Sequence, residues 1–232
     1  MKHIKYGLDA PIIPTIYILW GIVSLFINPL NWLTISISGL FLICGFIFIH
    51  TSLIGKSRIW DQIINELEIP KSSKIIDLGT GHGAVLVKFA NKIGLDGNVI
   101  GVDIWKSSDQ LGNSQKNTQQ IINSEGVSEK ARLLTADMVN LPLASNSFDF
   151  VVSSFAFHNI KPLSARKKAI KEAIRILKPN GQLVIVDTGY NLNNYLDEFN
   201  AMRLHSIKKR IFGFNGWWTG PWMSSYVVQG KK

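Results

Sequence analysis

The sequence predicts an α/β domain with a mostly parallel sheet, preceded by a hairpin of two membrane-spanning helices. Three observations support this prediction. No Asp, Glu, Lys or Arg occurs from Ala10 to Gly55, a stretch that contains two long apolar runs. From Lys74 onward, short β-branched segments alternate with segments of helical periodicity, which is typical of a parallel sheet with covered faces. A glycine-rich turn directly follows the first of these strands, at residues 79–83.

The composition of the 232-residue chain excludes several classes of protein. Cys44 is its single cysteine, so the chain can form neither an internal disulfide framework nor a cysteine-rich zinc site. Its five histidines are scattered without ligand spacing, and we expect no structural metal. Hydrophobic residues make up 46% of the chain, which excludes global disorder. The net charge of +9 fits an anionic membrane surface, a nucleic acid, or solubility alone.

Residues 1–55 are predicted to form a membrane anchor with two transmembrane helices, at about residues 11–28 and 33–53. Each run approaches the roughly 20 apolar residues that a span requires, and the turn residues Asn28–Asn31 separate the two runs. The alternatives are a signal peptide, a buried core hairpin and paired surface helices. A signal peptide is disfavoured because the sequence has no cleavage site. A buried hairpin is disfavoured because the domain is too small to cover both helices, and paired surface helices are disfavoured because neither run has a charged face.

The basic residues around the two runs predict the orientation of the anchor. Lys2 and Lys5 precede the first run, and Lys56 and Arg58 follow the second. The loop between the runs carries no charge. By the positive-inside rule, both termini and the domain formed by residues 56–232 therefore face the cytoplasm.

Hydrophobic periodicity and turn residues predict the remaining elements in order. After a short hinge at residues 55–57, the expected helices cover residues 57–68, 84–92, 113–124, 163–177 and 193–210. The expected strands cover residues 74–78, 98–102, 131–135, 148–153, 182–186 and 225–229. The polar stretch 105–119 is either part of a lid or a plain loop. Three aromatic residues near the C-terminus are candidates for lining an acceptor pocket: Trp217, Trp218 and Trp222.

The segment that carries chemistry begins at the end of the first strand. Asp77 is followed by glycines at 79, 81 and 83 and then by a helix, so backbone N–H groups can approach a ligand closely. Two interpretations of this turn are possible. Gly79-x-Gly81-x-x-Ala84 fits the dinucleotide fingerprint, and the same turn suits a ligand that carries a cationic amino group. Both interpretations place the ribose of the ligand at Asp103. Asp77 separates the two interpretations, because a carboxylate there repels a pyrophosphate and attracts a cationic amino group.

The stretch at residues 77–83 (DLGTGHG) resembles motif I of class I S-adenosylmethionine (SAM)-dependent methyltransferases. Further blocks of that family match in order and spacing at residues 99–103, 135–138, 147–153 and 177–183. The resemblance covers residues 58–190 and points to the small-molecule and lipid type of enzyme. It implies a Rossmann-like fold with a seven-stranded, mostly parallel sheet whose last strand is antiparallel, and SAM as the methyl donor.

The resemblance also implies the roles of individual residues. Contacts to the methionine part of SAM come from the glycine turn: Gly79, Thr80, Gly81 and Gly83. Asp77 would hold the amino group of the methionine, and Asp103 would accept from both ribose hydroxyls. Ile104 and Trp105 would flank the adenine ring. The remaining implied cofactor contacts are Asp137 and Met138 beside the adenine and Ser154 after the fourth strand.

His158 is the candidate general base. It lies in the segment 153–159, which faces the transferred methyl group in the resembled family. Imidazole titrates near neutral pH and suits proton transfer. The alternative is a structural role, in which His158 packs beside or caps the helix that begins at Leu163.

The sequence thus predicts a membrane-anchored enzyme that transfers a methyl group from SAM to a small-molecule or lipid-like acceptor. Two other functions stay open: a nicotinamide-dependent oxidoreductase that uses the same glycine turn, and a non-catalytic SAM-binding protein. Nucleic acid is disfavoured as a substrate, because no Asn-Pro-Pro-Tyr type of motif follows the fourth strand. The expected partners are therefore the acceptor and the membrane.

Overall fold

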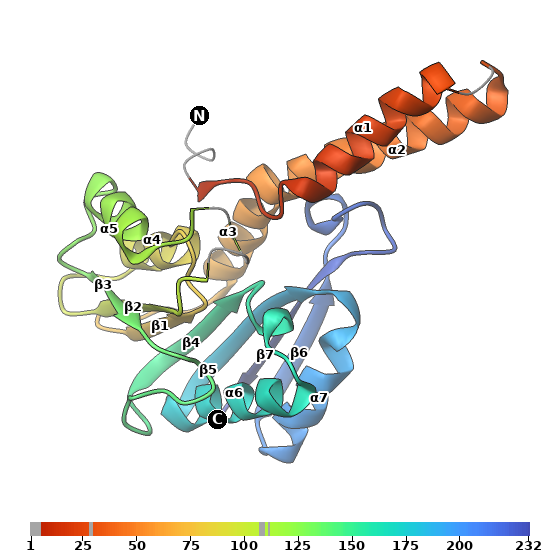
Figure 1. The fold of residues 1–232 in the computed structure, drawn as a ribbon. Coiled ribbons are helices and arrows are strands. Elements are labelled where there is room, and N and C mark those ends of the chain that lie inside the picture. Colours follow the sequence, from red (N-terminus) through yellow and green to blue (C-terminus); the bar gives the residue numbers. More distant parts are fainter. Residues whose placement is uncertain (1–5, 28–29, 107–109, 111) are drawn as a thin grey trace.

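The fold consists of a helical hairpin that projects from an α/β domain (Figure 1). It is seen in a computed structural model that describes residues 6–27, 30–106, 110 and 112–232. Lys2, Lys5 and the first half of the expected Asn28–Asn31 turn lie outside the described residues, as does part of the 105–119 stretch.

One seven-stranded sheet forms the centre of the α/β domain, in the order β3-β2-β1-β4-β5-β7-β6. Its strands are β1 (Lys74–Leu78), β2 (Asn98–Asp103), β3 (Ala131–Thr135), β4 (Phe148–Ser154), β5 (Leu177–Thr188), β6 (His205–Ile211) and β7 (Ser225–Lys231). The strands from β3 to β5 are parallel, whereas β7 is antiparallel to both of its neighbours. The predicted seven-stranded, mostly parallel sheet with an antiparallel last strand is confirmed.

Helices cover both faces of the sheet, because alternate side chains of each strand point to opposite faces. Ile75 of β1 belongs to the core beneath α3 (Lys56–Glu66), α4 (Ala84–Lys92) and α5 (Gln115–Ser124). Its neighbour Ile76 belongs to the core beneath α6 (Leu163–Ile176) and α7 (Leu192–Ala201). Both residues are fully buried. Short 3-10 turns complete the domain at Phe157–Asn159, Gly189–Asn191 and Phe214–Gly216.

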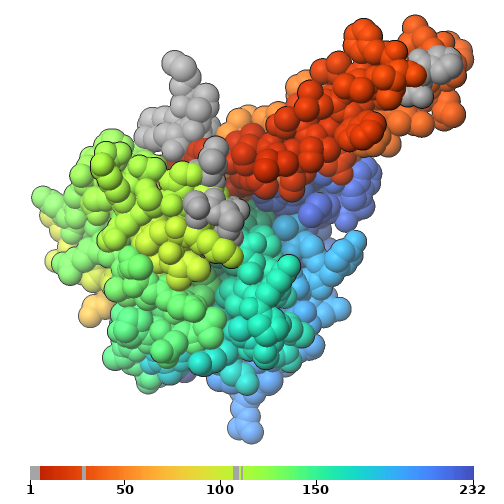
Figure 2. All heavy atoms as spheres, in the orientation of Figure 1, coloured from red at the N-terminus to blue at the C-terminus, as the bar shows by residue number. Residues whose placement is uncertain are grey.

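The hairpin consists of α1 (Ile12–Ile27) and α2 (Trp32–His50), which pack along each other. Asn31 caps α2 by accepting a hydrogen bond from the backbone N–H of Thr34, at 2.9 Å. Figure 2 shows the hairpin standing away from the body, and large apolar side chains such as Ile12 and Phe26 are exposed along it. An uncovered apolar surface of this extent indicates a membrane or a partner around the hairpin.

The length of the helices decides which of them can span a membrane. Trp32–Glu66 is a continuous 35-residue helix with an apolar window of mean hydropathy 2.3, and it is long and apolar enough to cross. α1 has 16 residues and falls below that length in the described part of the chain. One candidate span is thus found where the sequence predicts two.

The expected hinge at residues 55–57 is wrong. A π-helical turn at Thr51–Gly55 joins α2 directly to α3. Gly55 permits this junction, because a Cβ atom there would lie 2.0 Å from the carbonyl oxygen of Asn215. Thr51 also donates a hydrogen bond to the carbonyl of Trp217. The helix is therefore continuous through the predicted domain boundary and is packed against the loop between β6 and β7.

The helix expected over residues 193–210 is wrong in its second half. α7 ends at Ala201, Arg203 adopts a positive φ of 57°, and residues 205–211 form the edge strand β6. The hydrophobic periodicity of residues 193–210 predicted a helix there because β6 is mostly exposed and carries Lys208, Lys209 and Arg210, so it lacks the apolar pattern of a buried strand. Charged side chains of this kind are common on edge strands, where they oppose pairing with other chains. In addition, β5 begins at Leu177, five residues before the predicted start.

Candidate active site

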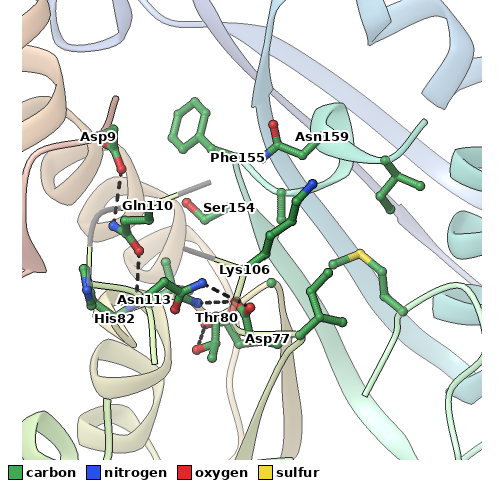
Figure 3. Close-up of a pocket in the computed structure, with 18 of the residues that line it drawn as sticks. Asp9, Asp77, Thr80, His82, Lys106, Gln110, Asn113, Ser154, Phe155 and Asn159 are labelled. Carbon is green, nitrogen blue, oxygen red and sulfur yellow. Dashed lines mark hydrogen bonds between the residues drawn. The ribbon is translucent and has the colours of Figure 1, made fainter. Parts of the chain in front are cut away.

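A cavity of about 410 Å³ opens where β1, β2 and β4 end. Asp77, Asp103 and Ser154 come from these three strand ends and line it. Figure 3 labels Asp77 and Ser154. The carboxyl ends of parallel strands are the usual ligand-binding edge of an open α/β sheet. The topology therefore gathers residues that are 77 positions apart in the sequence at one site.

The glycine turn forms the floor of this cavity. Gly79 and Gly81 have positive φ angles of 74° and 49°, which L side chains rarely adopt. A Cβ atom at Gly79 would lie 2.2 Å from the Cβ of Ala156, and one at Gly81 would lie 2.5 Å from Oε1 of Gln110. Both positions therefore favour glycine through their backbone conformation, and Gly79 also permits the close approach of Ala156.

Asp77 is the most unusual carboxylate of the site. Its side chain is 1% exposed and accepts a hydrogen bond from Oγ1 of Thr80 at 2.8 Å. Its other oxygen, Oδ1, is buried without a hydrogen-bond partner among the described residues. Burial raises the pKa of Asp77 to about 7, and the nearby Asp103 contributes to this increase. Such an unsatisfied carboxylate oxygen favours a ligand that brings a cationic hydrogen-bond donor into the cavity.

Asp103 holds the turn in place. It accepts hydrogen bonds from the backbone N–H groups of Gly81, at 2.8 Å, and Trp105, at 2.7 Å. The side-chain amide of Asn113 donates to the same carboxylate, at 3.3 Å. Asp103 therefore connects the end of β2 to the glycine turn and presents its carboxylate to the cavity.

A third group of lining residues lies beyond the strand ends. Asp137 is exposed and accepts from the backbone N–H of Val139 at 2.8 Å. Met138 and the exposed Ile104 line the cavity beside it. The expected contacts to ribose and adenine thus face the same cavity as the glycine turn.

Comparison with known proteins agrees with this geometry. Residues 76–185 match the family described as "Methyltransferase domain". The ubiquinone/menaquinone biosynthesis C-methyltransferase UbiE of Haemophilus ducreyi is 31% identical over 134 residues, which are 57% of this chain and 48% of that protein. The protein of the same name from Rickettsia prowazekii is 30% identical over 148 residues, or 63% and 56% of the two chains. The chain spans about half the length of these curated relatives.

A solved structure described as a SAM-dependent methyltransferase, from Aquifex aeolicus, has the same fold. Its TM-score is 0.57 at 19% identity, and the match covers 74% of this chain and 88% of that one. Residues 76–185 thus match a methyltransferase domain, and their fold is that of a solved SAM-dependent methyltransferase. SAM is therefore its methyl donor, and the nicotinamide alternative is not retained. The glycine turn, which leaves room for a ligand, and the unsatisfied oxygen of Asp77 both fit a donor with a cationic amino group.

Most of the predicted SAM contacts lie together in the methyltransferase domain. The lining residues among them are Asp77, Gly79, Thr80, Gly81, Asp103, Ile104, Asp137, Met138 and Ser154. Gly83 does not line the cavity; it has a positive φ of 78° and is the N-cap residue of α4. Trp105 does not line the cavity, and its place beside the adenine stays a prediction. It has a positive φ of 58°, and its indole donates to Oγ1 of Thr135 at 2.7 Å.

His158 also lies outside the cavity lining, although residues on both sides of it line the cavity. Its Nδ1 is 2.6 Å from Oδ1 of the buried Asp187. The hydroxyl of Tyr195 donates to the other oxygen of Asp187 at 2.6 Å, and Arg166 donates to the backbone carbonyl of His158. These contacts support the structural alternative, since they fix the segment that follows β4.

The tryptophan cluster does not line the cavity either. Trp218 packs between Phe48 of α2 and Phe155, with ring centroids 5.0 and 5.2 Å away. Trp222 is exposed. The cluster therefore joins the methyltransferase domain to the base of the hairpin, and Phe155 is its link to the cavity.

The lining residues that the sequence did not predict include two groups. One follows β4, within and just beyond the segment 153–159: Phe155, Ala156, Asn159, Ile160 and Lys161. The other comes from the ends of the hairpin: Tyr6, Asp9 and Lys56. No local pattern marks the second group, because only the packing of the hairpin against the domain brings it to the glycine turn.

Proposed function

We propose that the chain methylates a carbon atom of a small, quinone-like ring compound that reaches the site from a membrane. The observation that carries this proposal is the position of the cavity. Its donor side is formed by the glycine turn and Asp77, and its lining extends to Asp9 and Lys56, at the base of the apolar hairpin. The named activity of the UbiE proteins, C-methylation in quinone biosynthesis, supports this choice of acceptor.

The segment after β4 supplies an apolar wall for such an acceptor. Phe155, Ala156 and Ile160 line the cavity together with Met138 and Val139 of the loop after β3. A flat, apolar ring gains free energy by leaving water for such a surface, at about 25 cal/mol per Å² of apolar area. The wall therefore favours a ring compound over a charged or peptide acceptor.

Positioning accounts for the proposed catalysis. SAM supplies a methyl group on a sulfonium, which is a good leaving group. The residues of the chain hold the acceptor carbon in line with that methyl group and exclude water from the cavity, which lowers the entropic part of the barrier. The phenyl ring of Phe155 packs edge-on against the indole of Trp218, with ring centroids 5.2 Å apart, which restricts the movement of this wall.

Two lysines on the acceptor side suit a ring that carries a hydroxyl group. Lys106 and Lys161 line the cavity, and Figure 3 shows the Lys106 side chain reaching across it toward Asn159. A positive charge lowers the pKa of a nearby hydroxyl and favours the oxyanion. An oxyanion makes the adjacent ring carbons more nucleophilic. As the new C–C bond forms, the methyl–sulfur bond breaks and the oxyanion becomes a ring carbonyl. Loss of the proton on the methylated carbon to water then restores the aromatic ring and its oxyanion.

The hairpin is the proposed membrane anchor, with both termini and the methyltransferase domain on the cytoplasmic side. The exposed apolar surface of α1 and α2 supports this placement. Lys56 and Arg58 follow the hairpin directly, as the positive-inside rule requires of a cytoplasmic segment. Close to the hairpin base lie the exposed aromatic residues Phe214 and Trp222, a type common at membrane interfaces.

The test uses membranes that contain the full-length chain and SAM labelled on its methyl group. Label that enters an organic extract, in a compound with the chromatographic behaviour of a methylated quinone, is the expected result. Membranes with the Asp103→Asn variant are the matched control, because the substitution keeps the size of the side chain and removes the carboxylate. Label found only in water-soluble products would contradict the membrane acceptor. If no labelled product forms at all, the proposed methyl transfer is contradicted, and the chain is instead a SAM-binding protein without catalytic activity.

A further inference from the structure

We infer that Asp9 and Lys56, at the two cytoplasmic ends of the hairpin, bind the amino-acid end of the methyl donor. The inference rests on the proposed function and deepens it, because it makes the anchor a part of the donor site. Neither residue belongs to the methyltransferase family match at residues 76–185. The argument starts from the segment that precedes α1.

Residues 6–9 cross the glycine turn. The carbonyl oxygen of Tyr6 lies 2.9 Å from Nδ1 of His82, which belongs to that turn, and accepts from the side-chain amide of Gln110 at 3.3 Å. Gly7 has a positive φ of 73°, and a Cβ atom there would lie 3.3 Å from Cε1 of His82. The backbone thus bends closely over the imidazole before α1 begins.

Asp9 and Lys56 form an ion pair at the end of this segment. Ser52 of the π-helical turn donates to Oδ2 of Asp9 at 2.9 Å and accepts from the Asp9 backbone N–H at 2.8 Å. The two charged side chains are 24% and 21% exposed, and both line the cavity that holds Asp77 and the glycine turn. They are therefore held in place and face the ligand space.

Gln110 connects the ion pair to the turn. Its amide group donates to Oδ1 of Asp9, and its Oε1 accepts from the backbone N–H of His82, as the dashed lines in Figure 3 show. The glycine turn is the part of the site that is expected to hold the methionine of SAM. Asp9 and Lys56 consequently lie at the methionine side of the cavity.

The charges of the pair match those of the ligand. The amino-acid end of SAM carries an ammonium and a carboxylate, and charge-assisted hydrogen bonds to such groups are roughly twice as strong as neutral ones. Asp9 would accept from the ammonium, and Lys56 would donate to the carboxylate. Because the cavity is partly shielded from water, these contacts are screened less than surface ion pairs.

The test compares two ligands that differ only in the amino-acid end. S-adenosylhomocysteine carries it, and 5′-methylthioadenosine has a methyl group in its place. Their dissociation constants are measured by titration calorimetry on the full-length chain in detergent micelles, for the wild type and for Asp9→Asn and Lys56→Gln. Asp61→Asn is the matched control, since Asp61 pairs with Lys88 on an exposed part of α3 outside the cavity.

The expected result is selective. Each of Asp9→Asn and Lys56→Gln weakens S-adenosylhomocysteine at least tenfold and changes 5′-methylthioadenosine less than twofold, whereas Asp61→Asn changes neither. Equal weakening of both ligands would overturn the inference, because it would mean that the pair acts on the structure of the site. Unchanged affinity for both ligands would overturn it as well. If the wild-type chain binds neither ligand, the proposed function itself fails.

Discussion

The negative charge of Asp77 favours binding of a cationic ligand and lowers the folding stability of the ligand-free protein. Its carboxylate is buried beside Asp103, and its pKa of about 7 lies far above that of an aspartate in an unfolded chain. The unfolded chain therefore releases this proton near pH 4 and the folded chain near pH 7. Above pH 7 the charged, buried form costs on the order of 4 kcal/mol of folding free energy.

We predict that Asp77→Asn stabilises the ligand-free protein as the pH rises. The wild type loses stability between pH 4 and pH 7 because its unfolded state binds fewer protons, and the amide variant lacks this loss. Thermal unfolding at pH 5 and pH 8 measures the difference, which grows with pH. The same variant binds S-adenosylhomocysteine about tenfold more weakly, because it lacks the anionic oxygen. Equal melting temperatures at pH 8 would contradict the assigned burial cost.

His158→Ala is predicted to destabilise the protein. The substitution removes a partner from the fully buried Asp187 and releases the segment from Phe155 to Lys161 that lines the cavity. Loss of a hydrogen bond to a buried charged group costs about 1–3 kcal/mol. Thermal unfolding checks this, with His205→Ala as control, since that histidine is exposed on β6. An unchanged melting temperature with lost turnover would instead restore the role of general base.

At the scale of single residues, the sequence identified the cofactor side of the site better than its other side. Asp77 and Asp103 follow strands at the spacing that their chemistry requires, so local pattern sufficed. His158 could not be placed in this way, because its side-chain direction depends on the buried Asp187, 29 residues further along the chain.

At the scale of elements, the hairpin depends on small residues at its helix–helix contact. A Cβ atom at Gly45 would lie 2.8 Å from Cγ1 of Ile18, whereas one at Gly39 would meet nothing within 4 Å. The Oγ atoms of Ser24 and Ser38 are 2.6 Å apart across the same contact. Small and hydroxyl side chains of this kind let helices approach closely in membranes.

Two matched substitutions test this contact. Gly45→Leu is predicted to lower the midpoint of thermal unfolding in detergent, because forced repacking costs typically 1–3 kcal/mol. Gly39→Leu, on the same helix, is predicted to leave the midpoint unchanged. If both variants lose stability equally, α1 does not pack on α2 through Gly45.

The element boundaries that the sequence missed have a common cause. The turn at Thr51–Gly55 is helical because Gly55 packs against Asn215, and β6 is a strand because it pairs with β7. Each of these contacts joins segments that are distant in the sequence. Local periodicity reports the faces of isolated helices and strands, and it contains no signal for such long-range pairing.

At the scale of the whole molecule, the hairpin and the methyltransferase domain share one helix and one cavity. The helix Trp32–Glu66 runs from the hairpin into the core of the domain, where Ile59 and Trp60 are buried. The aromatic contact of Phe48 with Trp218 fastens the same junction. This connection places the cavity directly at the base of the hairpin.

We predict that Leu30 and Tyr190 lie on opposite sides of the membrane. Both side chains are exposed, one at the tip of the hairpin and the other in the domain after β5. In a Cys44→Ser background, Leu30→Cys is labelled from outside sealed cells by a membrane-impermeant maleimide, and Tyr190→Cys is labelled only after the cells are opened. Labelling of both positions from the same side would contradict a two-pass anchor.

The sequence by itself determined the fold class, the order in which candidate ligand-binding residues follow the parallel strands, and the cofactor. These follow from patterns that are local: strand and helix periodicity, the glycines that leave the turn open, and carboxylates at strand ends. Only the tertiary structure decided the continuous helix through residue 55, the edge strand β6, the structural position of His158 and the contribution of Asp9 and Lys56 to the cavity. Each of these depends on which distant segments pack together, and packing is a property of the folded chain in three dimensions.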